Sequence, residues 1–409
     1  MRLLTTAADP LAGYEPGGSV LFASSRGTLL TRGVRAVAGG DLATLAERVT
    51  AVLGEVGGHD GSRLAAGAVG FDGAAHLVVP ASVTWSGPLE PGAAPSLDGW
   101  RVRAVPAPED YAKAVRLALE LMDAENGGAA GDGSARTGDL GDVGDLGDLG
   151  DAAGPVPDGL RKVVLARTLE LSRDEPVDVL DLLRPLAGRD MSFAAPLPGG
   201  RTLIGASPEL LVSRRGRTVV SNPLAGSAAR SADPAEDRRR AAALAASSKD
   251  LHEHRLVVEA VADALQPYCV DLDVPSGPEL TSTETMWHLS TRVTGVLRDP
   301  DTPVLALAAA LHPTPAVCGT PRVRARRAIE ELEPFDRGFY TGLVGWTDAA
   351  GDGEWAVTIR CAEAAGRLLR LYAGAGIVPG SDPDKELAET SAKFRTMLRA
   401  LGVDTDALA

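Results

Sequence analysis

The chain has 409 residues, of which 44% are hydrophobic and 23% charged, enough to bury one large core or two smaller ones. Its formal charge of −14 argues against a nucleic-acid partner, because proteins that bind nucleic acids usually present a basic face. The three cysteines, Cys269, Cys318 and Cys361, lack C-x-x-C spacing, and no apolar run is long enough to span a membrane, so we expect a reduced, cytoplasmic protein.

The first hundred residues alternate short apolar runs with Gly and Pro, which predicts strands joined by turns. Residues 109–125 carry their apolar side chains at helical spacing and predict an amphipathic helix. Residues 126–159 are almost entirely Gly, Asp and Ala, and they lack the repeat motif of calcium-binding solenoids. We interpret this stretch as a solvated, disordered insertion between a helix and a strand.

After the insertion, β-branched runs such as RKVVLARTLEL and RTVVSNPLAG predict longer strands. Residues 342–378 predict a three-stranded antiparallel meander with turns at AAGDGE and AAGR. Apolar residues at three- and four-residue steps predict helices at about 234–264, 304–311, 322–332 and 383–401. The pattern indicates an α+β fold with much antiparallel sheet.

Two helical stretches each carry a pair of acidic residues. In SSKDLHEHRLVVEA, the two histidines point to opposite sides of a helix, which argues against a zinc site, but Asp250 and Glu253 share a face. The last helix repeats this arrangement with Glu386 and Glu389. These pairs are either solvated surfaces or two faces that meet around a hard cation such as Mg²⁺, and spacing alone does not decide.

Nine motifs occur in the order seen in the chorismate-utilising enzymes, and isochorismate synthase is the member that they most resemble. They are KVVLAR, IGASPELLV, NPLAGSAAR, SSKDLHEHRLVVEAV, MWHLSTRVTG, LHPTPAVCG, ELEPFDRGFYTGLVGW, GEWAVTIRCA and YAGAGIVPGSDPDKELAET. The resemblance covers roughly residues 109–401, whereas the first hundred residues match only loosely.

The resemblance implies a fold of large antiparallel sheets packed as a sandwich, with helices on the outside. Residues 1–105 would form a β-rich subdomain integrated with the main fold, and residues 106–409 the chorismate-binding catalytic domain. The implied reaction is the Mg²⁺-dependent isomerisation of chorismate to isochorismate, in which water adds at ring carbon C2 while the C4 hydroxyl leaves. We expect a monomer that needs no glutamine amidotransferase partner.

The resemblance also assigns roles to individual residues. Lys162 matches the general base for water, and Glu209 matches the general acid that protonates the departing hydroxyl. Glu253 and Glu389 match the metal ligands, with Asp250 and Glu386 as outer partners. The positions that match substrate contacts are Gly226, Ser227, His288, Ala316, Val317, Arg360, Tyr372, Gly374, Gly376 and Lys393.

Two positions bear on which member of the family this is. Ammonia-using relatives tend to carry Thr at the position of Ala316, so Ala316 favours water as the nucleophile. Val317 is smaller than the commoner Leu and could permit pyruvate elimination, which makes salicylate synthase the nearest alternative. Isochorismate feeds both catecholate siderophores, through 2,3-dihydroxybenzoate, and menaquinone; the motifs favour the siderophore branch. A non-enzymatic alternative is an acidic scaffold that binds divalent ions through residues 126–159.

Overall fold

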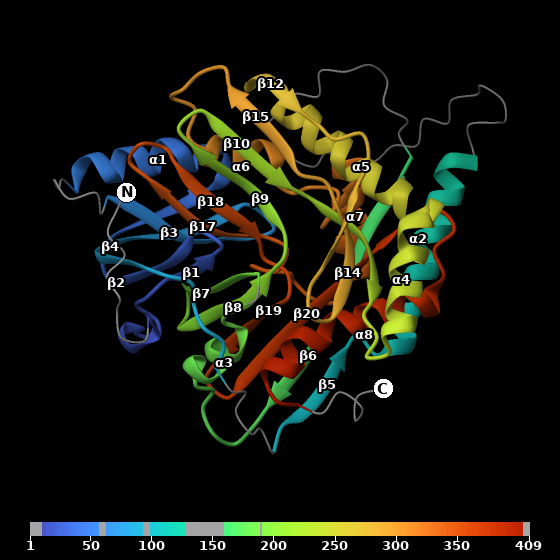
Figure 1. Ribbon diagram of the computed structural model, residues 1–409. Helices are drawn as coiled ribbons and strands as arrows, with labels where there is room; N and C mark the ends of the chain where they lie inside the picture. Colours follow the sequence, from blue (N-terminus) through green and yellow to red (C-terminus); the bar gives the residue numbers. More distant parts are fainter. Residues whose placement is uncertain (1–9, 57–62, 93–98, 128–158, 189, 404–409) are drawn as a thin grey trace, which may run out of the picture.

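The computed structural model describes residues 10–56, 63–92, 99–127, 159–188 and 190–403 (Figure 1). Most of the Gly/Asp-rich stretch, 128–158, therefore lies outside the described residues. Within the described part, eight α-helices and a short 3-10 helix at Pro10–Gly13 accompany two antiparallel sheets of 17 and three strands, which confirms the predicted α+β class. No helix in this part is long and apolar enough to cross a membrane.

The large sheet runs as one continuous series of antiparallel pairings. Its first half is, in spatial order, β12 (Cys269–Asp273), β15 (Val293–Leu297), β10 (Thr218–Asn222), β9 (Leu210–Arg215), β18 (Gly353–Val357), β17 (Leu343–Asp348), β3 (Leu64–Val69) and β4 (Ala74–Ser86). The second half continues with β2 (Gly27–Asp41), β1 (Leu21–Ser24), β7 (Met191–Leu197), β8 (Arg201–Ser207), β19 (Cys361–Ala365), β20 (Leu368–Ile377) and β6 (Lys162–Ser172), which pairs with both β5 (Arg101–Val105) and β16 (Gly319–Thr320).

The two halves of this sheet fold over each other as layers. Ala166 on β6 and Tyr372 on β20 belong to the same buried cluster as Phe22 on β1 and Val344 on β17. Strands far apart in the pairing order therefore face one another across a shared core, as in a sandwich. The N-terminal strands pair with later ones: β1 with β7, β3 with β17 and β5 with β6.

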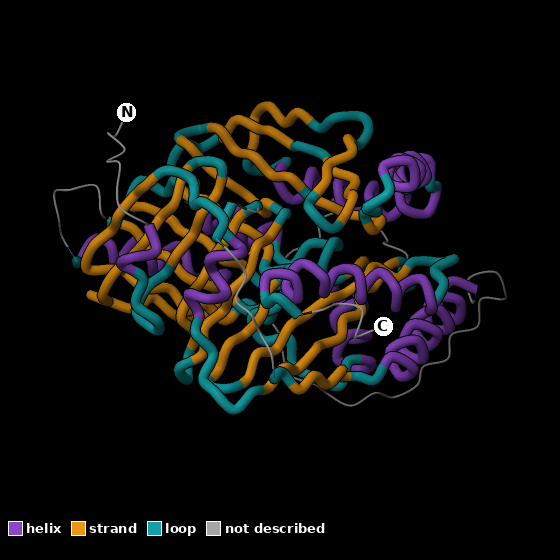
Figure 2. Tube along the Cα trace, turned by 60° about the horizontal axis from the view of Figure 1, so that its bottom comes forward, coloured by secondary structure: helices purple, strands orange, loops and turns teal. Residues whose placement is uncertain are grey.

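Helices cover the outer faces of both layers (Figure 2). One buried cluster joins the first half of the sheet to α1 (Leu42–Glu55), α5 (Ser248–Leu265) and α6 (Val304–Leu311). Two further clusters join the second half to α3 (Val179–Leu186) and α8 (Pro383–Ala400), and to α2 (Pro108–Gly127) and α7 (Arg322–Leu332). The predicted sandwich with external helices is confirmed.

A small sheet and one further helix complete the fold. The sheet has the order β11 (Leu224–Ala229), β14 (Met286–Ser290) and β13 (Glu279–Ser282), and α4 (Pro234–Ala246) packs beside it. The prediction of a single helix at 234–264 is wrong, because the helical stretch is interrupted at Ser247 and forms two helices, α4 and α5. Ser247 is extended (φ −74°, ψ 112°), and its hydroxyl accepts a hydrogen bond from the Asp250 amide as the N-cap of α5.

Two other sequence predictions need correction. Helices α1 and α3 lie in stretches for which no helix was predicted; α1 interrupts the N-terminal strands and is capped by the Asp41 side chain. The predicted three-stranded meander is instead two hairpins, β17–β18 and β19–β20, because its middle strand divides into β18 and β19 at residues 358–360. Arg360 sits in this break with a φ of +51°, a conformation that interrupts a strand.

Candidate active site

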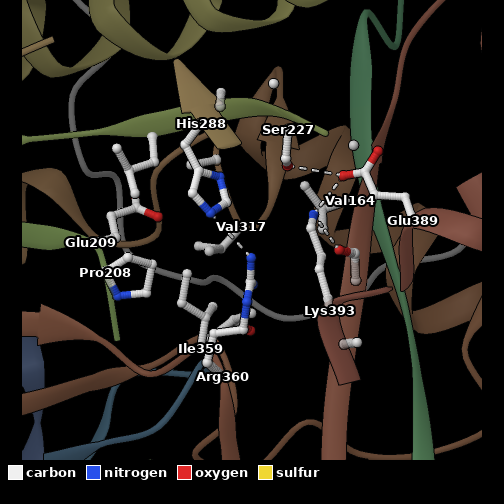
Figure 3. Close-up of a pocket in the computed structure, with 18 of the residues that line it drawn as sticks. Val164, Pro208, Glu209, Ser227, His288, Val317, Ile359, Arg360, Glu389 and Lys393 are labelled. Atoms are coloured by element: carbon white, nitrogen blue, oxygen red, sulfur yellow. Dashed lines mark hydrogen bonds and ion pairs between the residues drawn. The ribbon is translucent and has the colours of Figure 1, made fainter. Parts of the chain in front are cut away.

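One pocket collects residues from the small sheet, the large sheet, α5 and α8 (Figure 3). All ten residues that the resemblance assigns to substrate contacts line this pocket. Glu209, Glu253 and Glu389 line it as well, and Lys162 contacts Glu253 directly. Motifs that are separated by more than two hundred residues in the chain, such as those of Val164 and Lys393, therefore meet at a single place.

Lys162 is the first residue of β6 and is fully buried. Its Nζ lies 2.9 Å from Oε1 of Glu253, whose side chain is 10% exposed. This Nζ makes no hydrogen bond of normal geometry to any described residue, so charge alone holds it. A buried polar group without an aligned partner is costly and is often explained by a catalytic role.

Glu209 lies in the turn between β8 and β9, directly after Pro208, and is 2% exposed. Burial raises the pKa of its carboxyl to about 7, although the positive charge of Lys162 and a backbone hydrogen bond from Leu224 offset part of this effect. A carboxyl with this pKa holds its proton in many molecules at neutral pH, so it can act as an acid. In Figure 3 it lies across the pocket from Glu389.

Glu389 on α8 is held by two donors. Nζ of Lys393 lies 2.7 Å from its Oε1, and the Ser227 hydroxyl donates to the same oxygen at 3.2 Å. Burial raises the pKa of Glu389, but Lys393 and the other donors outweigh it and the net pKa falls below the usual value. Lys393 also donates to the Gly374 carbonyl at 2.9 Å, which ties α8 to β20.

The two predicted outer acids stand behind the pocket and do not line it. Glu386 is 1% exposed and pairs with Lys249, whose Nζ lies 2.6 Å from Oε1. Its other oxygen, Oε2, is buried and accepts no hydrogen bond from any described residue. Burial and the charge of Glu389 raise the pKa of Glu386, and burial likewise raises the pKa of Asp250.

Arg360 points into the pocket beside His288 (Figure 3). Its side chain is buried, its Nη2 lies 3.5 Å from Nε2 of His288, and its Nε has no hydrogen-bond acceptor among the residues that the structure describes. Burial lowers the pKa of His288 well below its usual value, and the charges of Arg360 and Lys393 lower it further, so the imidazole is neutral. An unpaired, buried guanidinium of this kind suits a substrate carboxylate.

The pocket also contains residues that sequence reasoning missed, Tyr340 and Thr341 among them. The Tyr340 ring stacks on that of Tyr372, with centroids 4.8 Å apart and planes 9° from parallel. Both missed residues belong to the motif ELEPFDRGFYTGLVGW, which was recognised as a family motif, and that membership was the available signal.

Gly376 provides space for the Glu253 carboxylate. A Cβ at this position would lie 2.1 Å from Oε1 of Glu253 and 3.1 Å from Cε of Lys162. We therefore expect Gly376→Ala to displace both side chains and lower kcat/KM by about 10–100-fold, the usual cost of disturbing the surroundings of a metal ligand, which is the role predicted for Glu253. Steady-state kinetics would measure this, with Gly54→Ala as the control, since a Cβ there meets no atom within 4 Å.

Comparison with known proteins identifies the family to which this geometry belongs. The family model described as chorismate binding enzyme matches residues 157–402. The chain belongs to the chorismate-binding enzyme family. Isochorismate synthase DhbC of Bacillus subtilis (strain 168) is 50% identical over 421 residues, which cover 98% of this chain and 97% of that protein.

Two further members of the chorismate-binding enzyme family extend the comparison. The vibriobactin-specific isochorismate synthase of Vibrio cholerae is 53% identical over 249 residues, which cover 60% of this chain and 63% of that protein. The crystal structure of DhbC from Bacillus anthracis has a TM-score of 0.83 at 45% identity, covering 96% of this chain and 99% of that one. The family resemblance drawn from the motifs is confirmed, and the acidic-scaffold alternative loses its support.

Proposed function

We propose that this chain converts chorismate to isochorismate by adding water at C2 and releasing the C4 hydroxyl. The observation that carries the proposal is one pocket lined by an acid with a pKa of about 7 and by two carboxylates on separate helices, one of which contacts the buried Lys162. The reaction needs a base, an acid, carboxylate anchors and neutralisation of the substrate's charge. The similarity to DhbC over nearly the whole chain supports the same conclusion.

The proposed proton transfers use Lys162 and Glu209. Lys162, acting as the neutral amine that a base requires, removes a proton from the water that attacks C2 and becomes an ammonium, and Glu209 gives its proton to the leaving C4 hydroxyl. Glu209 lies across the pocket from Glu389 in Figure 3, while Lys162 contacts Glu253, the other proposed metal ligand. The charge of Lys162 acts on the pKa of Glu209, so the proposed base and acid belong to one site.

The dianionic substrate would be held by Arg360, by Lys393 and by backbone groups. The Arg360 guanidinium has an unused Nε, and its fork can donate two parallel hydrogen bonds to a carboxylate. Gly226, with a φ of +78°, and Gly374 let the backbone come close to a ligand where a side chain would obstruct it. The stacked rings of Tyr340 and Tyr372 would form an apolar wall against the ring.

The donor set fits Mg²⁺, which prefers oxygen ligands and keeps several waters. Glu253 and Glu389 face the same pocket, and Oε2 of Glu386 is a buried oxygen without a donor. No three Asp, Glu, His or Cys side chains in the described part of the chain come close enough to share one ion. We therefore assign Glu253 and Glu389 as the protein ligands and leave the other positions to water and a substrate carboxylate. When bound, the ion would offset the negative charge of these groups.

Charge balance supports joint binding of metal and substrate. Three lysines face four carboxyl groups here: Lys162, Lys249 and Lys393 against Asp250, Glu253, Glu386 and Glu389. The two positive charges of Mg²⁺ and the two negative charges of chorismate cancel, so loading both leaves the net charge of the site unchanged. Binding of Mg²⁺ alone or of chorismate alone would change the net charge of this poorly solvated site by two units, which costs free energy.

We assign the product to the 2,3-dihydroxybenzoate siderophore branch, because the relatives include DhbC and a vibriobactin-specific enzyme. Menaquinone synthesis is the alternative branch. Ala316 and Val317 both line the pocket, where they would contact the ring or the attacking nucleophile. Because Val317 is smaller than the commoner Leu, salicylate formation is the alternative reaction. Ala316 stands where ammonia-using relatives tend to carry Thr, which supports the use of water without an amidotransferase.

Incubation with chorismate and Mg²⁺, followed by chromatographic separation of isochorismate, salicylate and anthranilate, tests the proposed function. We expect isochorismate as the main product, and none once a chelator removes the metal. Salicylate as the main product would assign the alternative reaction. The absence of any product with metal present would contradict the assignment to chorismate chemistry.

A further inference from the structure

Each of the three glutamates around the proposed metal site has its own lysine. Lys162 pairs with Glu253 and Lys393 pairs with Glu389, and both lysines have proposed roles in the reaction. The third pair joins Lys249 to Glu386 at 2.6 Å. Lys249 does not line the pocket and has no role in binding or proton transfer, so its placement needs a separate explanation.

Lys249 connects the two helices that carry the proposed metal ligands. It lies in the first turn of α5, four residues before Glu253, and Glu386 lies three residues before Glu389 on α8. Among the hydrogen bonds and ion pairs of the described residues, the contact between Lys249 and Glu386 is the one that joins α5 to α8. Both helices also pack on β11, so this contact adds a direct link between the elements that carry Glu253 and Glu389.

Two features of its position disfavour the charged form of Glu386. Its side chain is 1% exposed and lies beside the like charge of Glu389, and both features disfavour a second carboxylate. Lys249 engages Oε1 only, and the buried Oε2 has no hydrogen bond of normal geometry to any described residue, although the Ser381 side chain lies near enough to lower the pKa of Glu386. That free oxygen suits a water molecule of a hydrated Mg²⁺ ion, which typically keeps several waters.

We propose that Lys249 is a positioning residue of the metal site, which bridges α5 to α8 and holds Glu386 as a carboxylate that receives a metal-bound water. This inference rests on the proposed use of Mg²⁺. Partners of this outer kind typically contribute 10–100-fold to metal affinity. The lysine is 30% exposed at its side chain, so its replacement leaves the sheet core intact.

Calorimetric titration of Mg²⁺ into the chorismate-free protein tests the proposal. We expect Lys249→Met to bind Mg²⁺ about 10–100-fold more weakly than the unmodified chain, and Lys249→Arg to recover most of the affinity. Adding Lys249→Met to Glu386→Gln should cause no further loss, because the lysine acts through that carboxylate. The control is Lys385→Met, which removes a lysine charge from an exposed position next to Glu386. This variant should bind Mg²⁺ as tightly as the unmodified chain.

Equal Mg²⁺ affinity in Lys249→Met and the unmodified chain would overturn the positioning role, as would a lower melting temperature with unchanged affinity. An additive loss in the double variant would also overturn it. If Lys249→Met does not fold, Lys249→Gln carries the same expectation of weaker binding. If the unmodified chain binds no Mg²⁺ and also forms product at the same rate after a chelator removes the metal, the proposed cofactor fails and the positioning role fails with it, whereas the identity of the product judges the chorismate reaction separately.

Discussion

Replacing Lys162 with alanine should lower kcat by about 10²–10⁴-fold, the usual contribution of a general base. The amine is fully buried, touches Glu253 and has no aligned hydrogen bond, so no other described group can take over its contact with the attacking water. The KM for chorismate should change much less, because Arg360 and Lys393 hold the substrate. Steady-state kinetics at saturating Mg²⁺ would separate the two constants.

Removing Lys162 also leaves Glu253 without its cation, so a structural effect must be distinguished from a catalytic one. Lys162→Met keeps most of the side-chain volume and should lose turnover to the same degree, while circular dichroism should show an intact fold. Mg²⁺ should still bind to Lys162→Met, since the lysine would no longer compete for the Glu253 carboxylate. Turnover near the unmodified rate in either variant would contradict the role of Lys162 as base.

Family motifs predicted the residues of the site more completely than local patterns predicted the fold. The acidic pairs on α5 and α8 were visible from three-residue spacing, but whether the helices meet depends on the whole sandwich. His254 is 2% exposed, whereas His252 is exposed, as their spacing predicts. The Nδ1 of His254 donates to the Ala225 carbonyl, which fixes α5 against the strand that carries Gly226 and Ser227.

The failures of local prediction fall at positions that serve the pocket. The run WAVTIRCA has a continuous strand-like pattern, yet the chain leaves the β18 direction at Thr358 and resumes as β19 at Cys361. The break brings Arg360 into the pocket with a φ of +51°, a conformation that non-glycine residues seldom adopt and often reserve for functional sites. Thr341, a β-branched residue with a φ of +58°, lines the same pocket. The periodicity of apolar residues in the sequence predicts neither of these two backbone conformations.

Arg337 illustrates a supporting residue that sequence alone presents as a surface charge. It is 2% exposed, pairs with Glu333, and donates to the carbonyls of Val164 at 2.7 Å and Val317 at 2.8 Å. It thereby ties the strand that begins at Lys162 to the loop that carries Val317. Arg337 makes these contacts to backbone carbonyls that lie far from it in the sequence. No pattern of residue types predicts such contacts.

Replacing Glu209 with glutamine should lower kcat by about 10²–10⁴-fold, because the amide keeps the shape of the side chain but cannot protonate the C4 hydroxyl. In the unmodified chain, kcat should fall as the pH rises through about 7, the pKa to which burial raises this carboxyl, since the acid form is lost there. The residual activity of Glu209→Gln should lack that decline. A pH profile of kcat for both proteins measures the difference, and an unchanged profile would contradict the role of Glu209 as acid.

The same substitution has an effect on stability that needs no substrate. The pKa of Glu209 rises from 4.5 in the unfolded chain to about 7 in the fold, so the native state binds the proton more tightly and its stabilising effect is complete below pH 4.5. That contribution is lost as the pH rises from 4.5 to about 7. Relative to Glu209→Gln, which does not titrate, the unmodified chain should therefore lose about 3 kcal/mol of unfolding free energy across this range. Urea unfolding at pH 5 and pH 8 measures the difference. If the two proteins respond equally to pH, Glu209 is ionised in the resting fold, and the acid would have to be another group in the pocket.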